Sequence, residues 1–268
     1  MINGHRRGPT FEPGAYGGAW TLASSVQLAA QGVDRVFHWG CDENFSEDGH
    51  HIYYGNAWVM ASARKLFGPS SAANVSVLVA PGDAPDGQTL AVSKQAGEMS
   101  ADVCASTTTA SGVGGPLRNG TGIGLLVSVF SQRKDCTAAT TVSVAFQCPT
   151  PSACGEGAAP AVRIMVLNHT TSVYGQILRA AGDHEGWLRY DDGEAYPLGG
   201  APANSMLTPT GLAGIKERAT HWLRQQTGVF TPREMAVSDR VTVTCSGGGC
   251  TATIVASPPS VHALFVEL

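Results

Sequence analysis

The run from His38 to Asn44 concentrates side chains that bind or process polar ligands. It reads His38-Trp39-Gly40-Cys41-Asp42-Glu43-Asn44 and closes a β-prone stretch over Asp34–Trp39. An aromatic face beside carboxylates and amides suits a sugar, because the apolar ring face stacks while the hydroxyls form hydrogen bonds. We therefore predict that His38, Trp39 and Asp42 contact a carbohydrate. In the alternative interpretation, Trp39 belongs to a core and the acidic residues lie in a solvated loop.

Two arginines near the start of the chain, Arg6 and Arg7, are further candidates for ligand binding. A guanidinium group holds a carboxylate through two parallel hydrogen bonds, so these arginines would favour an acidic sugar. The alternative is that both are simply solvated.

Other kinds of site find little support in the sequence. His38, His50 and His51 lack a fixed helical spacing and a matching acidic ligand, so we predict no metal site. The chain contains neither a Gly-x-x-x-x-Gly-Lys phosphate loop nor a Gly-x-Ser-x-Gly elbow, and we predict no cofactor.

The elements around the candidate site follow the order helix, strand, helix. Apolar residues at helical spacing predict helices over Pro13–Gln31 and Tyr54–Phe67, which end at Gly32 and Gly68. The strand over Asp34–Trp39 lies between them, as at the end of a (β/α) barrel. A parallel strand needs neighbours on both sides, so we expect a missing N-terminal barrel half or self-association through the exposed barrel edge.

The pattern changes after Gly68-Pro69-Ser70-Ser71, where short β-prone runs alternate with Gly, Pro and Asp turns. We predict strands at Val75–Ala80, Thr89–Lys94, Gly124–Phe130, Thr140–Gln147, Ala161–Leu167, Arg240–Cys245, Thr251–Ala256 and Val261–Glu267. Ala105–Gly122 is predicted to be a surface loop, and Leu212–Gln226 an inserted helix. The predicted fold class is α+β, with the C-terminal part of a (β/α)8 barrel in residues 1–70 and an antiparallel β-sandwich in residues 71–268.

Composition narrows the classes of partner. The 268 residues carry a formal net charge of −4 without a basic run, which argues against nucleic acid. No apolar run approaches the roughly 20 residues that cross a bilayer. The N-terminus lacks the apolar stretch of a signal peptide, so we expect that the natural N-terminus lies upstream.

Sequons and cysteines indicate the secretory pathway. Four of the seven asparagines begin an Asn-x-Ser/Thr glycosylation sequon, namely Asn44, Asn74, Asn119 and Asn168. Cys245 and Cys250 flank a Gly-rich turn between two predicted strands and are expected to form a disulfide. Cys148 and Cys154 would pair likewise, and Cys104 would then remain to pair with Cys136. Cys41 would be the unpaired seventh cysteine. This pairing is one of the 15 that six cysteines allow. Free buried thiols in a cytosolic protein are the alternative.

A family resemblance rests on the order of these parts. The segments PGAYGGAWTLASSVQLAAQGVDRVFHWG, YYGNAWVMASARKLFG, TPREM and VTVTCSGGGCTATIVASPPSVHALFVEL together resemble the C-terminal half of glycoside hydrolase family 39. The likeness is closer to its α-L-iduronidase-like branch than to its β-xylosidases. It implies a secreted or lysosomal glycoprotein of carbohydrate metabolism, acting on glycosaminoglycan- or xylan-like glycans.

The resemblance also implies a retaining mechanism with two glutamates about 5 Å apart. One belongs to an Asn-Glu motif in the first half of the barrel, and the other is expected at about Met1 to Asn3, where no glutamate occurs. Glu12 lies too far along the chain, so no catalytic residue is assigned. Three hypotheses follow: a glycosidase portion inactive by itself, a non-catalytic glycan-binding or assembly protein derived from that family, and an incomplete product that does not fold stably alone.

Overall fold

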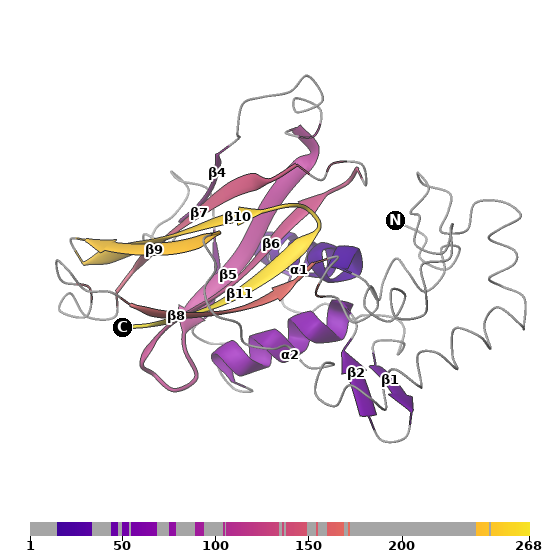
Figure 1. Cartoon of the computed structure of the whole chain (residues 1–268), viewed down its shortest axis with the longest axis horizontal. Helices are drawn as coiled ribbons and strands as arrows, with labels where there is room; N and C mark the ends of the chain where they lie inside the picture. The colour runs from indigo at the N-terminus through magenta and orange to yellow at the C-terminus, as the bar shows by residue number, and fades with distance from the viewer. Residues whose placement is uncertain are drawn as a thin grey trace, which may run out of the picture.

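A computed structural model gives the fold of the chain (Figure 1). It describes residues 15–33, 44–47, 50–53, 55–68, 75–78, 89–93, 104, 106–133, 136, 138–148, 154, 160–168, 171, 240–246 and 248–268. Within these residues the fold is α+β, with two helices and eleven strands.

The helices are α1 (Ala15–Ala30) and α2 (Gly55–Phe67). The strands are β1 (Asn44–Glu47), β2 (His50–Tyr53), β3 (Ser76–Leu78), β4 (Thr89–Ser93), β5 (Thr108–Pro116), β6 (Gly122–Ser131), β7 (Thr140–Gln147), β8 (Ala161–Leu167), β9 (Val241–Ser246), β10 (Gly249–Ala256) and β11 (Ser260–Glu267).

The strands form two main antiparallel sheets and a separate hairpin. The five-stranded sheet has the order β3-β5-β6-β11-β8, and the four-stranded sheet has the order β4-β7-β10-β9. Within the described residues, β1 pairs only with β2. Among the described residues the strands do not close into a barrel. The predicted antiparallel sheets are therefore confirmed.

The two main sheets face each other across one apolar core. Strand β10 alternates between inward and outward residues, so that Ala252 and Ile254 are fully buried while Thr251 and Thr253 are only partly buried. This period of two directs one face of the strand into the core. From the opposite sheet, Leu125 and Val127 of β6 and Leu264 of β11 belong to the same cluster.

Helices α1 and α2 pack on the other face of the five-stranded sheet. Their cluster includes Leu22 and Trp58 from the helices, and Leu126, Phe130 and Phe265 from the strands. All ten residues of β6 are buried, because this strand has the helices on one face and the second sheet on the other.

Close contacts fix the helices to this sheet. The Ser128 hydroxyl of β6 donates a hydrogen bond to the carbonyl of Ala19 in α1 across 2.8 Å. The Tyr16 ring meets the Phe130 ring edge-on, with centroids 5.0 Å apart. At the other end of β6, Gly124 admits Phe67, since a Cβ there would lie 2.9 Å from the Phe67 ring.

The first turns of α1 and the start of α2 lie against each other. The Thr21 hydroxyl donates to the Asn56 side-chain oxygen across 2.6 Å, and both residues are buried. A Cβ at Gly18 would lie 2.9 Å from the carbonyl oxygen of Gly55, so the glycine allows this close approach.

Most predicted elements are present. Helix α1 lies within the predicted range, α2 begins one residue later than predicted, and each of the eight predicted strands ends within two residues of its expected bounds. Gly32 and Gly68 end the helices with positive φ angles of 81° and 77°, as left-handed C-terminal caps do. The predicted strand over 34–39 and the predicted helix over 212–226 lie outside the described residues.

One prediction is wrong, and one element was missed. The supposed surface loop at 105–122 contains β5, which pairs with β3 and β6. The β1–β2 hairpin was not predicted at all, and it places His50 opposite Glu47. The proposed boundary near residue 70 stays a prediction, although helices from before it and strands from after it share one hydrophobic cluster.

Candidate functional site

The five predicted sugar-binding residues lie outside the described residues. Arg6 and Arg7 belong to the segment that leads into α1, while His38, Trp39 and Asp42 belong to the segment between α1 and the β1–β2 hairpin. The structure therefore describes the helices and the hairpin that adjoin these segments, and not the candidate site itself.

The starts of the two helices lie against each other. Thr21 and Asn56 join the helices by their hydrogen bond, and Gly18 lies against Gly55. The chain therefore enters α1 and α2 at neighbouring points of the molecule. The β1–β2 hairpin precedes α2 by one residue, and β2 contacts that helix.

The predicted glycosylation sites fall in different settings. Asn119 is exposed on the tight turn between β5 and β6, where its side-chain oxygen accepts from the Thr121 N–H across 3.2 Å. Asn168 follows β8, and its side-chain oxygen accepts from the backbone N–H of Thr171 across 2.9 Å. Asn44 begins β1, while Asn74 lies outside the described residues.

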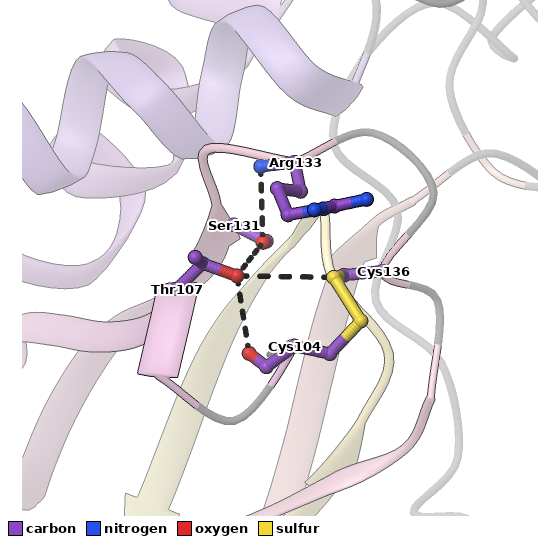
Figure 2. Close-up of a disulfide and its surroundings, with 5 residues drawn as sticks. All are labelled: Cys104, Thr107, Ser131, Arg133 and Cys136. Carbon is purple, nitrogen blue, oxygen red and sulfur yellow. Dashed lines mark hydrogen bonds between the residues drawn. A yellow bond between two sulfur atoms is a disulfide. The ribbon is translucent and has the colours of Figure 1, made fainter. Parts of the chain in front are cut away.

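The three disulfides favoured by the sequence are present in the structure: Cys104–Cys136, Cys148–Cys154 and Cys245–Cys250. Figure 2 shows the first of them beside Thr107, whose hydroxyl lies 3.2 Å from the Ser131 hydroxyl and 3.8 Å from the Cys136 sulfur. Thr107 also donates to the carbonyl of Cys104. This polar cluster ties the start of β5 to the end of β6.

The other two disulfides touch each other. The Sγ atom of Cys250 lies 3.4 Å from that of Cys148 and 3.2 Å from that of Cys154. These three sulfurs all fall within 4.8 Å of one another, a spacing that would suit a thiophilic metal if they were thiolates. As disulfide sulfurs they lack the thiolate form that ligates a metal.

Sequence reasoning missed a buried Ser–His pair in β11. The Nε2 atom of His262 lies 3.1 Å from the Ser260 hydroxyl, and both residues are buried. Nδ1 of His262 has no hydrogen-bond partner among the described residues. The strand's alternation gave a sign of this arrangement, since residues 260, 262 and 264 share the face that holds Leu264 in the inter-sheet core.

This pair is not arranged as a nucleophile and its base. Burial lowers the pKa of His262 to about 4, so the imidazole is neutral at pH 7. Ser260 is only 2% exposed, which keeps a substrate away from its hydroxyl. We assign the pair to the core of the sandwich.

The three disulfides are characteristic of proteins that fold in an oxidising environment such as the secretory pathway. In the part of the chain that the structure describes, neither helix has both the length and the apolar character needed to cross a bilayer. Comparisons with protein-family models, curated proteins and solved structures give no match for this chain.

Proposed function

We propose that this chain is the C-terminal portion of a retaining glycoside hydrolase of the family 39 type, acting on glycosaminoglycan- or xylan-like glycans in a lysosomal or extracellular setting. In this proposal the chain binds glycan through its helix–strand–helix part and does not cleave it without the rest of the barrel. The observation that carries the proposal is the contact between the starts of α1 and α2.

Successive helices of a (β/α) barrel begin at the same face, where the strands end and substrates bind. The buried Thr21–Asn56 hydrogen bond and the approach of Gly18 to Gly55 give α1 and α2 such neighbouring starts. Of the 24 positions between Ala30 and Gly55, strands β1 and β2 occupy eight, and residues 31–43 remain for the proposed strand and its loop. This arrangement supports a helix–strand–helix unit with its ligand-binding face at the helix starts.

Both predicted groups of binding residues precede a helix start. Arg6 and Arg7 come before α1, and Trp39 and Asp42 come before α2. In this proposal Trp39 stacks on a sugar ring and the arginines bind a uronate carboxylate at a single site. No residue that matches the family pattern supplies the two glutamates, so the proposed role of this chain alone is binding.

Calorimetric titration with xylo-oligosaccharides and with iduronate-containing oligosaccharides tests this role. We expect one class to bind, and we expect Trp39→Ala to abolish that binding while the circular dichroism spectrum is unchanged. Met60→Ala is the matched control, because Met60 is 50% exposed on α2 and is not among the proposed binding residues. Equal binding by Trp39→Ala and the parent chain would refute the proposed site.

Fluorogenic iduronides and xylosides test the second half of the proposal. The chain alone should give no turnover above buffer. Turnover that persists in the Asp42→Asn/Glu43→Gln double variant would show that other residues of the chain supply catalysis, and the inactive-portion proposal would then fail.

The proposal includes a binding partner for the exposed edge of the predicted barrel strand over Asp34–Trp39. This partner is the remainder of the barrel or, when that is lacking, a second copy of the chain. Light scattering on a sizing column distinguishes the two, since a strict monomer over a range of concentrations would exclude self-association.

A further inference from the structure

We propose that Cys148, Cys154, Cys245 and Cys250, the sulfur cluster, form a thiol–disulfide exchange site that takes small thiols of the glutathione class as substrate. This role is independent of the proposed glycan function. When an external thiol opens the Cys245–Cys250 disulfide, the released Cys250 displaces Cys148 from the Cys148–Cys154 disulfide.

The fold brings the four cysteines together from separate segments. Cys245 of β9 and Cys250 of β10 are directly opposite in the antiparallel register. Cys148 follows β7, the other neighbour of β10, and its N–H donates to the carbonyl of Gly248 across 3.1 Å. Figure 1 shows the β9–β10 hairpin in the orange-to-yellow part of the chain, beside β7.

Cys250 is the point at which the two disulfides meet. Its sulfur contacts both sulfurs of the Cys148–Cys154 bond, at 3.4 and 3.2 Å. Either disulfide can therefore present a sulfur to the other once one cysteine is released as a thiol. No such sulfur neighbour is found for Cys104–Cys136 within the described residues, where Thr107 and Ser131 lie beside it (Figure 2).

Burial gives the exchange a direction. Cys154 and Cys250 are 0% and 4% exposed and belong to the inter-sheet core, whereas Cys148 and Cys245 are partly exposed. A thiolate is costly in an apolar core, because burial disfavours its charge. A bond between the two buried sulfurs, Cys154 and Cys250, leaves only the two more accessible cysteines, Cys148 and Cys245, to carry a thiol or a mixed disulfide.

The exchange proceeds in two balanced steps. An external thiolate attacks Sγ of Cys245, the Cys245–Cys250 bond breaks, and its electron pair passes to Cys250. The Cys250 thiolate then attacks Sγ of Cys154, the Cys148–Cys154 bond breaks, and Cys148 leaves as a thiolate that takes a proton from water. The products are a mixed disulfide at Cys245, a Cys154–Cys250 disulfide and a Cys148 thiol, with no net oxidant consumed.

Side-chain rotation must precede the second step. Cys250 lies at nearly equal distances from Cys148 and Cys154, so it faces the side of their bond. Exchange requires the attacking sulfur in line with the bond that breaks. Opening of the Cys245–Cys250 bond frees the Cys250 side chain to make this rotation.

Two variants, each made with Cys41→Ser to remove the seventh cysteine, test the proposal from opposite sides. Cys245→Ser frees Cys250, and we expect native alkylation with iodoacetamide to label Cys148. Cys148→Ser frees Cys154, and we expect alkylation to label Cys245. Peptide mapping by mass spectrometry should find the same new Cys154–Cys250 disulfide in both variants.

The proposal is overturned if Cys245→Ser keeps its Cys148–Cys154 bond and Cys148→Ser keeps its Cys245–Cys250 bond. The matched control is Cys136→Ser, which frees Cys104 away from the cluster and should leave both cluster disulfides unchanged. If this control also forms Cys154–Cys250, the exchange is general scrambling and the assigned site is refuted. Circular dichroism of each variant confirms that mapping is done on folded protein.

Discussion

Thr21 of α1 donates a buried hydrogen bond to Asn56 of α2 across 2.6 Å, at the point where the two helices meet. Thr21 is 3% exposed and Asn56 is 7% exposed, so water does not readily replace either partner. A buried polar group without a partner costs more than a hydrogen bond contributes when made. This contact therefore holds the two helix starts in one relative position.

Replacing Thr21 by Val removes the donor but keeps the branched shape. We expect the free energy of unfolding to fall by about 1–3 kcal/mol, because the Asn56 oxygen is left buried without this donor. Urea unfolding followed by circular dichroism measures the change. Thr21→Ser is the control, since it keeps the hydroxyl and loses one methyl group worth about 0.8 kcal/mol. An equal loss in both variants would assign the effect to packing.

Gly18→Ala should weaken the contact between the helices. The new Cβ would meet Leu167 at 2.5 Å and the Gly55 carbonyl oxygen at 2.9 Å, and the backbone oxygen can move only if the helices separate. We expect a loss of about 1–3 kcal/mol from overpacking, despite the better helix propensity of Ala.

The matched substitution for that experiment is Gly249→Ala. There the nearest atom to an added Cβ is the carbonyl oxygen of Phe146 at 3.4 Å, an ordinary contact. We expect thermal unfolding to show a change within about 0.5 kcal/mol. A Gly18→Ala protein as stable as Gly249→Ala would contradict the close helix approach.

His262 makes stability depend on pH. Its pKa falls from 6.5 in the unfolded chain to about 4 in the folded one, because burial disfavours the charged ring. Between these values the unfolded state binds a proton that the native state does not, so stability decreases as pH decreases from about 6.5 to about 4. The full loss is about 3 kcal/mol by linkage, and below that window this residue adds no further slope.

Urea unfolding at several pH values checks this expectation when the parent chain is compared with His262→Gln. The variant should show a shallower decrease over the same window, because the glutamine does not titrate. Its absolute stability is not the test, since Gln also changes the contact with Ser260. Identical pH slopes would contradict the assignment of the proton to His262.

The contribution of each disulfide to the free energy of unfolding should increase with the length of the loop that it closes. Cys104–Cys136 spans 32 positions, and Cys148–Cys154 spans 6. Loop-closure entropy gives about 3–4 kcal/mol for the first and about 2 kcal/mol for the second. Paired Cys→Ala variants in a thermal unfolding series should follow that order, and the reverse order would point to lost packing at the buried Cys154.

The exposed ion pair between β8 and β11 should contribute little to the free energy of unfolding. Arg163 and Glu267 approach within 2.6 Å, but their side chains are 41% and 36% exposed. Arg163 also stacks over the Phe265 ring, 4.9 Å from its centroid, so neutralising only the carboxylate leaves that contact in place. Glu267→Gln should change the free energy of unfolding by less than about 1 kcal/mol, as measured with urea at low and high salt.

The sandwich was predictable because several of its strands alternate apolar and more polar residues in their own sequences. Strand β7 alternates the small residues Thr141, Ser143 and Ala145 with Val142, Val144 and Phe146, which are at most 1% exposed. Such a period of two needs no knowledge of the partner strands. The predicted bounds of β7 and β8 are therefore those of the structure.

Strand β5 was not predictable in this way. Its sequence, TTASGVGGP, has the glycine and proline content of a loop. The tertiary packing supplies the reason for that composition, since a Cβ at Gly112 would lie 2.8 Å from the Leu126 carbonyl oxygen and 3.0 Å from the Leu78 side chain. Leu126 and Leu78, which are distant from Gly112 in sequence, leave no space for a larger side chain there. A local sequence pattern carries no information about such distant neighbours.

The candidate site was predicted from residue types alone, whereas the contact between the helix starts is known only from the packing. Thr21 and Asn56 are 35 residues apart, and no local sequence pattern predicts that they form a hydrogen bond. Pairings over long sequence separation depend on the whole core, which explains why the Thr21–Asn56 contact was missed. His262 was placed in a strand, but its contact with Ser260 was missed, although the alternation of that strand places both residues on the face that holds Leu264 in the inter-sheet core.

The position of β11 constrains how this protein can assemble during synthesis. It lies between β6 and β8, and those strands pair with it rather than with each other. Until residues 260–267 have emerged from the ribosome, β8 has no place in the sheet and α2 lacks part of the surface it packs on. Part of the apolar face of α2 therefore stays uncovered from the synthesis of α2 to that of β11, an interval in which chaperone binding would compete with aggregation.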